Sequence, residues 1–271
     1  MVDEGQPRLF RVREGRRLAY YGQRPDAGYW DSVWDARLEE GSYRASAGGV
    51  LDESVRLMLP YLPRKGRILE AGCGRSQVVL SLRARGYDCE GVEQSAETVE
   101  RVKGILPDLP ISHGDVTDLP VPDAHYRAYI SIGVIEHRKA GPEPFLSEAR
   151  RVLEPGGVAA ISVPCFNALR QAKCRFGLYP GPRPGMDFYQ YAYSVPEMTS
   201  ILDDHGFGIL ATRYYGLDYG LRTECPLYNW LRGRRYVGGA LRRAAGRLGR
   251  ICRPAAHMAL FICRSNSQGD T

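Results

Sequence analysis

Long apolar runs are missing from this chain of 271 residues. No segment approaches the roughly 20 consecutive apolar residues of a membrane-spanning helix, and the best candidate, 257–263, has the length of a strand. The N-terminal residues carry charges where a secretory signal needs an apolar segment. We therefore expect a cytoplasmic protein.

Paired cysteine motifs and phosphate-binding loops are missing as well. The seven cysteines are scattered and include no Cys-x-x-Cys, which argues against a disulfide framework and a zinc site and predicts buried thiols. The chain also lacks Gly-x-x-x-x-Gly-Lys-Ser/Thr, so a P-loop is excluded.

Acidic residues are absent from 225 to 269, where nine arginines occur. The net charge of +6 therefore arises from this segment. A helix over 235–253 would gather apolar residues on one face and arginines opposite. Two interpretations stay open: the apolar stripe packs on the sheet, or the helix meets an anionic membrane or substrate. Nucleic acid has less support, because the rest of the chain is net acidic.

Short strands alternate with helices through the centre of the chain. Strands are predicted at 67–70, 87–93, 111–114, 126–132, 158–163, 209–214 and 257–263, and helices at 77–85, 95–105, 142–153 and 195–205. This order predicts a Rossmann-like α/β fold, with a doubly wound, mostly parallel sheet that binds ligands at the carboxyl ends of its strands.

The segments around this centre differ in composition. We expect an aromatic cap at 1–50, a ligand-binding core at 51–165, a lid at 166–194, the rest of the sheet at 195–264 with a basic insertion at 226–254, and a tail at 265–271. The Gly/Pro/aromatic stretch 176–194 is too long for a simple connection, which predicts a lid or binding loop. Cap and lid aromatics either close over a ligand or form core; the candidates for substrate contact are Tyr29, Trp30, Tyr189 and Tyr191, and the cap also contains Trp34.

A glycine turn follows the first predicted strand of this centre, in the sequence Glu-Ala-Gly-Cys-Gly at 70–74. Glycine permits positive φ and close approach of a ligand to the backbone, and the next helix offers free N–H groups. Glu93 ends the second strand, where an acid can accept hydrogen bonds from ribose hydroxyls. Asp115 follows the third strand, within reach of an adenine amino group. Together they predict an adenosine ligand, and Gln77 in place of a third Gly or Ala disfavours a dinucleotide.

Further motifs extend this pattern: Gly-Asp-Val at 114–116, Ser-Ile-Gly-Val-Ile-Glu-His at 131–137 and Ala-Arg-Arg-Val-Leu-Glu-Pro-Gly-Gly at 149–157. Residues 50–165 thereby resemble class I S-adenosylmethionine-dependent methyltransferases of the type 11/12-like superfamily. The resemblance implies a seven-stranded sheet with an antiparallel last strand, and S-adenosyl-L-methionine as cofactor. Its implied contacts are Glu70, Ala71, Gly72, Cys73, Gly74, Glu93, Gln94, Asp115, Val116 and Gly133. Ser76 stands where many relatives have a third glycine.

His137 follows the fourth strand of this pattern. With its ordinary near-neutral pKa, it is the candidate base for a hydroxyl acceptor; alternatively it orients the following loop. The Glu136–His137 pair resembles part of the metal site of ubiquinone-type O-methyltransferases, but Gly133 replaces a further acid there, so we expect no required metal.

The fourth strand does not end in the Asn/Asp-Pro-Pro-aromatic run of base and amide N-methyltransferases, which disfavours a DNA-adenine role. We expect methyl transfer to a small-molecule, glycan-linked or lipid-linked acceptor, first of all at oxygen. The alternatives are a noncatalytic S-adenosylmethionine-binding scaffold, a nucleic-acid methyltransferase and a nicotinamide oxidoreductase. For location, the alternative to a free cytoplasmic protein is a peripheral one at the inner membrane surface, held by 235–253.

Overall fold

The computed structural model describes residues 9–22, 24–26, 28–31, 40–234, 237–248 and 253–266. Its strands are β1 (Phe10–Glu14), β2 (Arg17–Gly22), β3 (Ile68–Ala71), β4 (Cys89–Glu93), β5 (Ile111–His113), β6 (Tyr126–Ile132), β7 (Leu153–Pro164), β8 (Asp187–Tyr193), β9 (Phe207–Tyr215) and β10 (Met258–Ser265). Its α-helices are α2 (Arg44–Ala47), α3 (Glu53–Met58), α4 (Gln77–Arg83), α5 (Ala96–Ile105), α6 (Glu143–Val152), α7 (Ala168–Arg175), α8 (Val195–Asp204), α9 (Leu217–Glu224), α10 (Pro226–Arg232) and α11 (Gly238–Leu248). Short 3-10 turns are η1 (Glu40–Tyr43), η2 (Leu59–Tyr61), η3 (Ile135–His137) and η4 (Arg253–Ala255).

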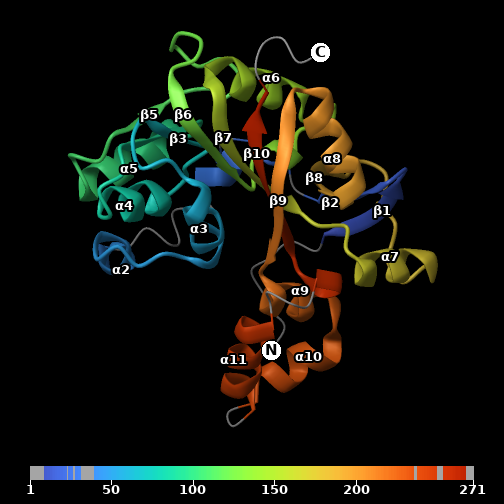
Figure 1. Ribbon diagram of the computed structural model, residues 1–271. Helices are drawn as coiled ribbons and strands as arrows, with labels where there is room; N and C mark the ends of the chain where they lie inside the picture. Colours follow the sequence, from blue (N-terminus) through green and yellow to red (C-terminus); the bar gives the residue numbers. More distant parts are fainter. Residues whose placement is uncertain are drawn as a thin grey trace.

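A seven-stranded sheet forms the centre, in the order β5-β4-β3-β6-β7-β10-β9 (Figure 1). Strands β3 to β7 are parallel, and β10 lies antiparallel between β7 and β9. This confirms the predicted Rossmann-like fold class. One boundary differs: β7 begins at Leu153, and the predicted break at 154–157 is instead a shift of register against β6.

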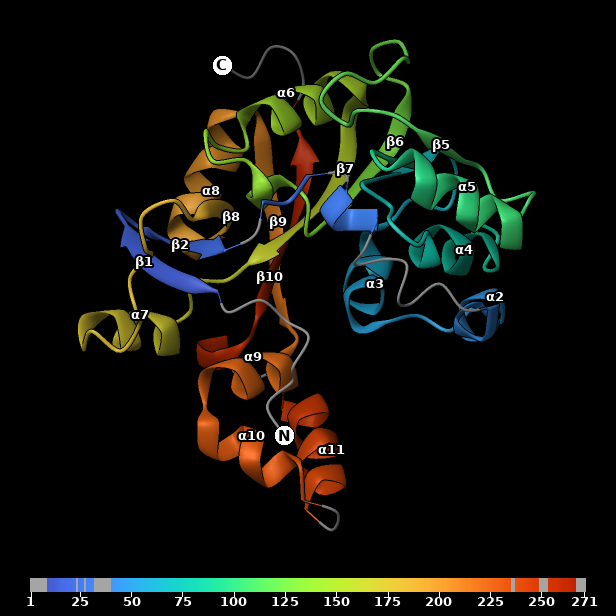
Figure 2. The same cartoon turned by 180° about the vertical axis from the view of Figure 1, so that it is seen from behind.

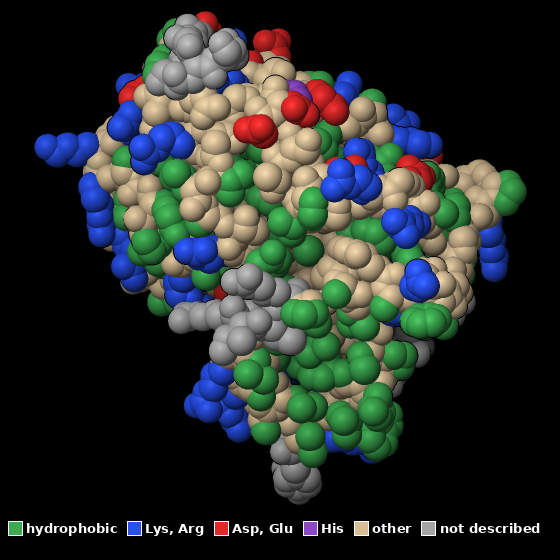
Figure 3. Space-filling view, turned by 45° about the vertical axis from the view of Figure 1, so that its right-hand side comes forward, with side chains coloured by type: hydrophobic (Ala, Val, Ile, Leu, Met, Phe, Trp, Pro, Cys, Tyr) green, Lys and Arg blue, Asp and Glu red, His purple; other side chains and the backbone are tan. Residues whose placement is uncertain are grey.

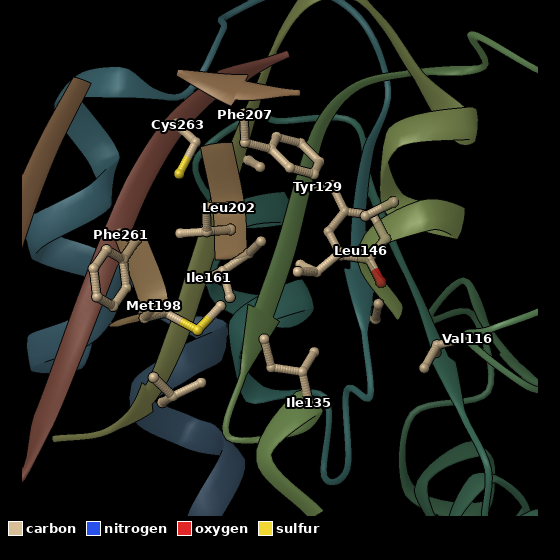
Figure 4. Packing of buried hydrophobic residues seen from close by; sticks show 14 of the residues in the cluster. Val116, Tyr129, Ile135, Leu146, Ile161, Met198, Leu202, Phe207, Phe261 and Cys263 are labelled. Atoms are coloured by element: carbon tan, nitrogen blue, oxygen red, sulfur yellow. The ribbon is translucent and has the colours of Figure 1, made fainter. Parts of the chain in front are cut away.

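Alternate residues of a strand point to opposite faces of the sheet. Helices pack on both faces, so the sheet has a core on each side. In β10, Ala259, Phe261 and Cys263 face a core with α6 and α8, whereas Leu260 and Ile262 face a core with α3, α4 and α5. Figure 4 shows the first core, where Phe207, Phe261 and Cys263 lie near side chains of α6 and α8: Leu146, Met198 and Leu202.

A second sheet has the order β1-β2-β8. Part of the stretch 176–194, for which a lid or binding loop is predicted, belongs to this sheet, because β8 pairs with β2. The physical reason is burial: β2 buries Leu18, Ala19 and Tyr20, and such a strand needs a partner to satisfy its backbone groups.

A helical projection made of α9, α10 and α11 extends from the far end of the sheet, between β9 and β10 (Figures 1 and 2). The predicted helix over 235–253 is described only from 237 to 248 and at its C-terminal end. Its buried Ala245 packs against Leu217 of α9 and Ala255. Of the apolar stripe, Ala245 thus packs on a neighbouring helix and not on the sheet, whereas Val237 and Leu248 are exposed.

None of the described helices combines the length and the apolar character needed to cross a membrane. Cys174 and Cys225 are only half-buried, whereas buried thiols were expected throughout. Trp34 and Cys252 lie outside the described residues.

Candidate functional site

A cavity of about 490 Å³ opens at the carboxyl ends of β3, β4 and β6. Most of the predicted contacts line it: Glu70, Gly72, Cys73, Gly74, Glu93, Gln94, Asp115, Val116, Gly133, His137 and Trp30. Pattern reasoning from the sequence did not single out other lining residues, among them Val134 inside the 131–137 motif and, outside the motifs, Pro25, Asp52, Arg75, Thr117, Arg138 and Phe145.

The glycine turn after β3 has left-handed backbone at three residues. Gly72, Gly74 and Ser76 have φ of +77°, +48° and +58°. A Cβ atom at Gly72 would lie 2.5 Å from Cγ2 of Val134, so glycine is required there both for conformation and for space. Ser76 has the positive φ that glycine adopts most readily. This explains why the resemblance leads one to expect a third glycine at that position.

We expect Gly72→Ala to lower the free energy of unfolding by about 2–4 kcal/mol, because left-handed strain and overpacking add. Gly86→Ala is the matched control: its φ is +79°, but no atom lies within 4 Å of the added Cβ. It should lose only about 1–2 kcal/mol, from strain alone. Urea unfolding measures both, and equal losses would contradict the close packing of Gly72 on Val134.

Glu93 lies at the end of β4 with its carboxylate anchored by backbone amides. Oε2 accepts a hydrogen bond from Gly74 N at 2.8 Å, and Oε1 accepts one from Ser95 N at 3.1 Å. Burial raises the pKa of Glu93, and these amide donors oppose the rise. Each carboxylate oxygen can accept a further hydrogen bond, so the group can still receive two donors from a ligand.

Two other predicted acids have different surroundings. Glu70 is buried and accepts a hydrogen bond from Val79 N of α4. Burial raises its pKa well above the usual value. Asp115 is exposed at the cavity, and its Oδ1 accepts both the amide and the hydroxyl of Thr117 at 2.8 Å. Glu70 therefore orients α4, while Asp115 presents a carboxylate at the mouth.

The turn at 28–31 forms a roof between two sides of the cavity. The hydroxyl of Ser95, next to the Glu93 loop, donates to Asp31. Trp30 packs edge-on against His137 with ring centroids 4.9 Å apart, and the hydroxyl of Tyr29 donates to that of Tyr189 at 3.1 Å. Tyr29 and Tyr189 thus support the Trp30–His137 wall from behind the cavity lining.

His137 has a defined tautomer. Its Nδ1 lies 2.9 Å from the carbonyl oxygen of Tyr189; because a carbonyl only accepts, Nδ1 carries the proton and Nε2 keeps its lone pair. Burial lowers the pKa of His137 to about 4, although the hydrogen bond to Tyr189 opposes it. The side chain is therefore neutral at pH 7, with a pKa well below the near-neutral value expected from sequence.

A β-bulge brings Tyr189 to this wall. Tyr20 of β2 pairs with Gln190 and Tyr21 pairs with Phe188, so Tyr189 is the extra residue of β8. Bulges re-aim side chains. Tyr191, the other predicted lid contact, is buried instead with its hydroxyl donating to Glu14 at 3.1 Å and does not line the cavity. Ala71 is also buried, within β3, and does not line it.

Glu136 is a buried acid beside His137. It is 2% exposed, and no partner of its Oε2 is found in the described part of the chain. Burial raises the pKa of Glu136 to about 8, so the carboxyl is mostly protonated at neutral pH. Across the described ranges, no group of three or more His, Cys, Asp or Glu is arranged to hold a metal ion.

These residues fit S-adenosylmethionine. The carboxylate of Glu93, with acceptor capacity left on both oxygens, suits the ribose hydroxyls, and Asp115 with Val116 suits the adenine. The left-handed turn at Gly72 keeps backbone close to the cavity.

Comparisons with known proteins find similarity to methyltransferases. Residues 69–161 match a family model described as a methyltransferase domain. A Mycolicibacterium smegmatis protein named "Probable S-adenosylmethionine-dependent methyltransferase" is 32% identical over 143 residues, which are 52% of each chain. The rice 2-methyl-6-phytyl-1,4-hydroquinone methyltransferase 2 is 37% identical over 106 residues, 37% of this chain and 30% of that protein. The solved structure of geranyl diphosphate C-methyltransferase from Streptomyces coelicolor has a TM-score of 0.51 at 16% identity, covering 78% of this chain and 74% of that one. The chain thus spans about half the length, or less, of these curated relatives.

Proposed function

We propose that this chain, whose residues 69–161 match a methyltransferase-domain family model, is a class I S-adenosylmethionine-dependent methyltransferase that transfers a methyl group from that cofactor to an acceptor oxygen. The acceptor is a small molecule or is linked to a lipid or a glycan. One observation carries the proposal: a single cavity joins the carboxylates suited to adenosine, Glu93 and Asp115, to a neutral histidine, His137.

When bound, S-adenosylmethionine supplies a methyl group already activated on a sulfonium, so positioning the acceptor provides much of the acceleration. Glu93 and Asp115 hold the adenosine portion, and Gly72 lets the backbone approach the methionine and ribose portion. Nε2 of His137 accepts a hydrogen bond from the acceptor hydroxyl, orients its oxygen and receives its proton. Trp30 excludes water from this side of the cavity.

A lipid-linked acceptor is supported by two observations. The rice relative is named for a hydroquinone with a phytyl chain, which combines oxygen atoms with an isoprenoid tail. The cavity wall here includes the apolar side chains of Trp30, Val134 and Phe145, which suit such a group. Peripheral contact with an anionic membrane through 235–253 belongs to the same proposal, because a lipid-linked acceptor lies at such a surface.

We expect His137→Ala to reduce methyl transfer by about 100-fold, at the low end of general-base effects because the lowered pKa makes the imidazole a weak base. Cofactor affinity should not change. The assay follows a radiolabelled methyl group from S-adenosylmethionine to prenylated hydroquinones, simple phenols and polyprenyl-linked sugars. With the best acceptor, wild-type activity should show no ionisation near pH 6.5, because the pKa of His137 is about 4.

His125→Ala is the control, since this histidine contacts Arg67 at 2.8 Å and does not line the cavity. Full transfer by His137→Ala would rule out the catalytic role and leave the histidine to orient its loop. Cofactor binding with no transfer to any acceptor would favour the noncatalytic scaffold.

A further inference from the structure

Large apolar side chains are exposed on the helical projection. Leu227 and Trp230 of α10 are 64% and 56% exposed, and Tyr219, Val237 and Leu248 of the same projection are exposed too. Phe176 and Leu178, just after α7, add to this set. Nζ of Lys173 in α7 lies 2.8 Å from Oε2 of Glu224 in α9. Phe176 and Leu178 therefore follow a helix that is a neighbour of the projection. Figure 3 shows hydrophobic side chains gathered over the projection, with Lys and Arg at its edge.

The charges around these side chains are of one sign. Of the two acids in α9, Glu224 is buried and Asp218 is paired with Arg232 at 3.0 Å, and no acid follows until Asp270. Further arginines are exposed, and the described residues give none of them an ion pair: Arg234, Arg242, Arg243 and Arg247. The guanidinium of Arg234 lies 4.1 Å from the ring centroid of Trp230.

The apolar stripe of α11 is only partly open to a partner. Ala245 is buried against α9, whereas Leu248 at the end of the helix is 53% exposed. The larger anchors, Leu227 and Trp230, belong to α10, which the helical pattern over 235–253 did not include. The largest exposed apolar side chains of the projection therefore come from α10, next to the exposed arginines of α11.

We propose that α10 and α11 form a docking surface for an anionic lipid bilayer, with Leu227 and Trp230 entering the interface and Arg242, Arg243 and Arg247 facing lipid phosphates. Apolar and aromatic groups beside arginines match the two layers of such an interface, acyl chains and anionic headgroups. A nucleic acid would use the arginines but would leave the exposed leucine and tryptophan without a partner. The inference rests on the proposed membrane contact through 235–253. It adds that the main apolar side chains of this contact, Leu227 and Trp230, belong to α10.

The test is co-sedimentation of the full chain with vesicles of mixed phosphatidylglycerol and phosphatidylcholine, compared with phosphatidylcholine alone. Wild-type protein should bind the anionic vesicles and lose binding in high salt. Because each arginine near the surface contributes roughly a fivefold gain in partitioning, Arg242→Glu with Arg243→Glu should lower binding by about 25-fold or more. Leu227→Ser with Trp230→Ser should lower it by about tenfold or more, since both side chains lose apolar burial.

Matched controls lie elsewhere on the surface. Arg101→Glu with Lys103→Glu makes the same change of charge on α5, and Leu210→Ser removes an exposed apolar side chain of β9; neither should alter vesicle binding by more than about twofold. Equal binding by the α10 and α11 variants, or preference for duplex DNA over anionic vesicles, would overturn the proposal. The methyl-transfer assay with simple phenols, run on each variant, separates this outcome from failure of the proposed function, because the cavity is unchanged.

Discussion

Glu93→Ala should bind S-adenosylhomocysteine about 100-fold more weakly than the wild-type chain. The carboxylate accepts hydrogen bonds from Gly74 N and Ser95 N and has acceptor capacity for two ribose hydroxyls. Hydrogen bonds to a charged group contribute about 1.5–3 kcal/mol each, and a loss of about 2.7 kcal/mol is a factor of 100 in Kd. Isothermal titration calorimetry measures this directly.

Glu90→Ala is the control for this experiment. Glu90 lies on the same strand, accepts a hydrogen bond from the Tyr126 hydroxyl at 2.5 Å and does not line the cavity. It should bind S-adenosylhomocysteine as the wild-type chain does. Thermal unfolding without ligand verifies that both variants are folded, and near-normal affinity in folded Glu93→Ala would remove Glu93 from the cofactor site.

Glu224→Gln should lower the free energy of unfolding by about 3–5 kcal/mol, the range for breaking a buried ion pair. The Glu224 side chain is 0% exposed and accepts from Arg11, Arg170, Lys173 and Tyr179 at 2.8–3.1 Å. It joins β1, α7 and α9. Without the carboxylate, the buried guanidinium of Arg170 loses its counter-charge. Urea unfolding followed by circular dichroism gives the difference.

Glu154→Gln is the matched control, because its pair with Arg127 is 3.4 Å long and the Glu154 side chain is 39% exposed. Exposed pairs contribute about 0–1 kcal/mol, so this variant should stay within that range. A similar small loss in Glu224→Gln would contradict the structural role of the cluster.

The Glu224 cluster also predicts a pH dependence. Burial raises the pKa of Glu224, but Arg11 and Arg170 outweigh it and hold the pKa at about 2, against an ordinary 4.5. A depressed acid pKa stabilises the folded state above the unfolded value, and this stabilisation is lost as pH falls through the window from 4.5 towards 2. The stability difference between the wild-type chain and Glu224→Gln should therefore shrink over this interval, whereas a constant difference would contradict the low pKa.

The cofactor half of the site could be predicted from the sequence because it depends on local rules. Apolar strands end where glycine or an acid follows, and parallel strands bring those ends to one edge of the sheet. Gly72, Glu93 and Asp115 therefore meet in one cavity, as their spacing in the chain predicts.

The roof of the site could not be predicted, because it depends on contacts between distant segments. The bulge that separates Tyr189 from Tyr191 arises from register between β2 and β8, residues about 170 apart in the chain. The low pKa of His137 likewise comes from burial beneath this roof, whose Trp30 side chain packs on the imidazole. A histidine in a motif shows neither its burial nor its neighbours.

The projection shows the same limit. The helical pattern indicated an amphipathic α11, but it did not show that its buried Ala245 packs against Leu217 of α9 and Ala255. Periodicity gives the faces of one helix and not which neighbour covers them.

Calorimetric titration of the wild-type chain with S-adenosylhomocysteine, with NAD as the comparison, tests the cofactor assignment most directly. We expect micromolar binding of S-adenosylhomocysteine and none of NAD, because the cavity offers acids for one adenosine while Gln77 replaces the small residue of a dinucleotide turn. Binding of NAD, or of neither ligand, would contradict the assignment of this cavity to S-adenosylmethionine.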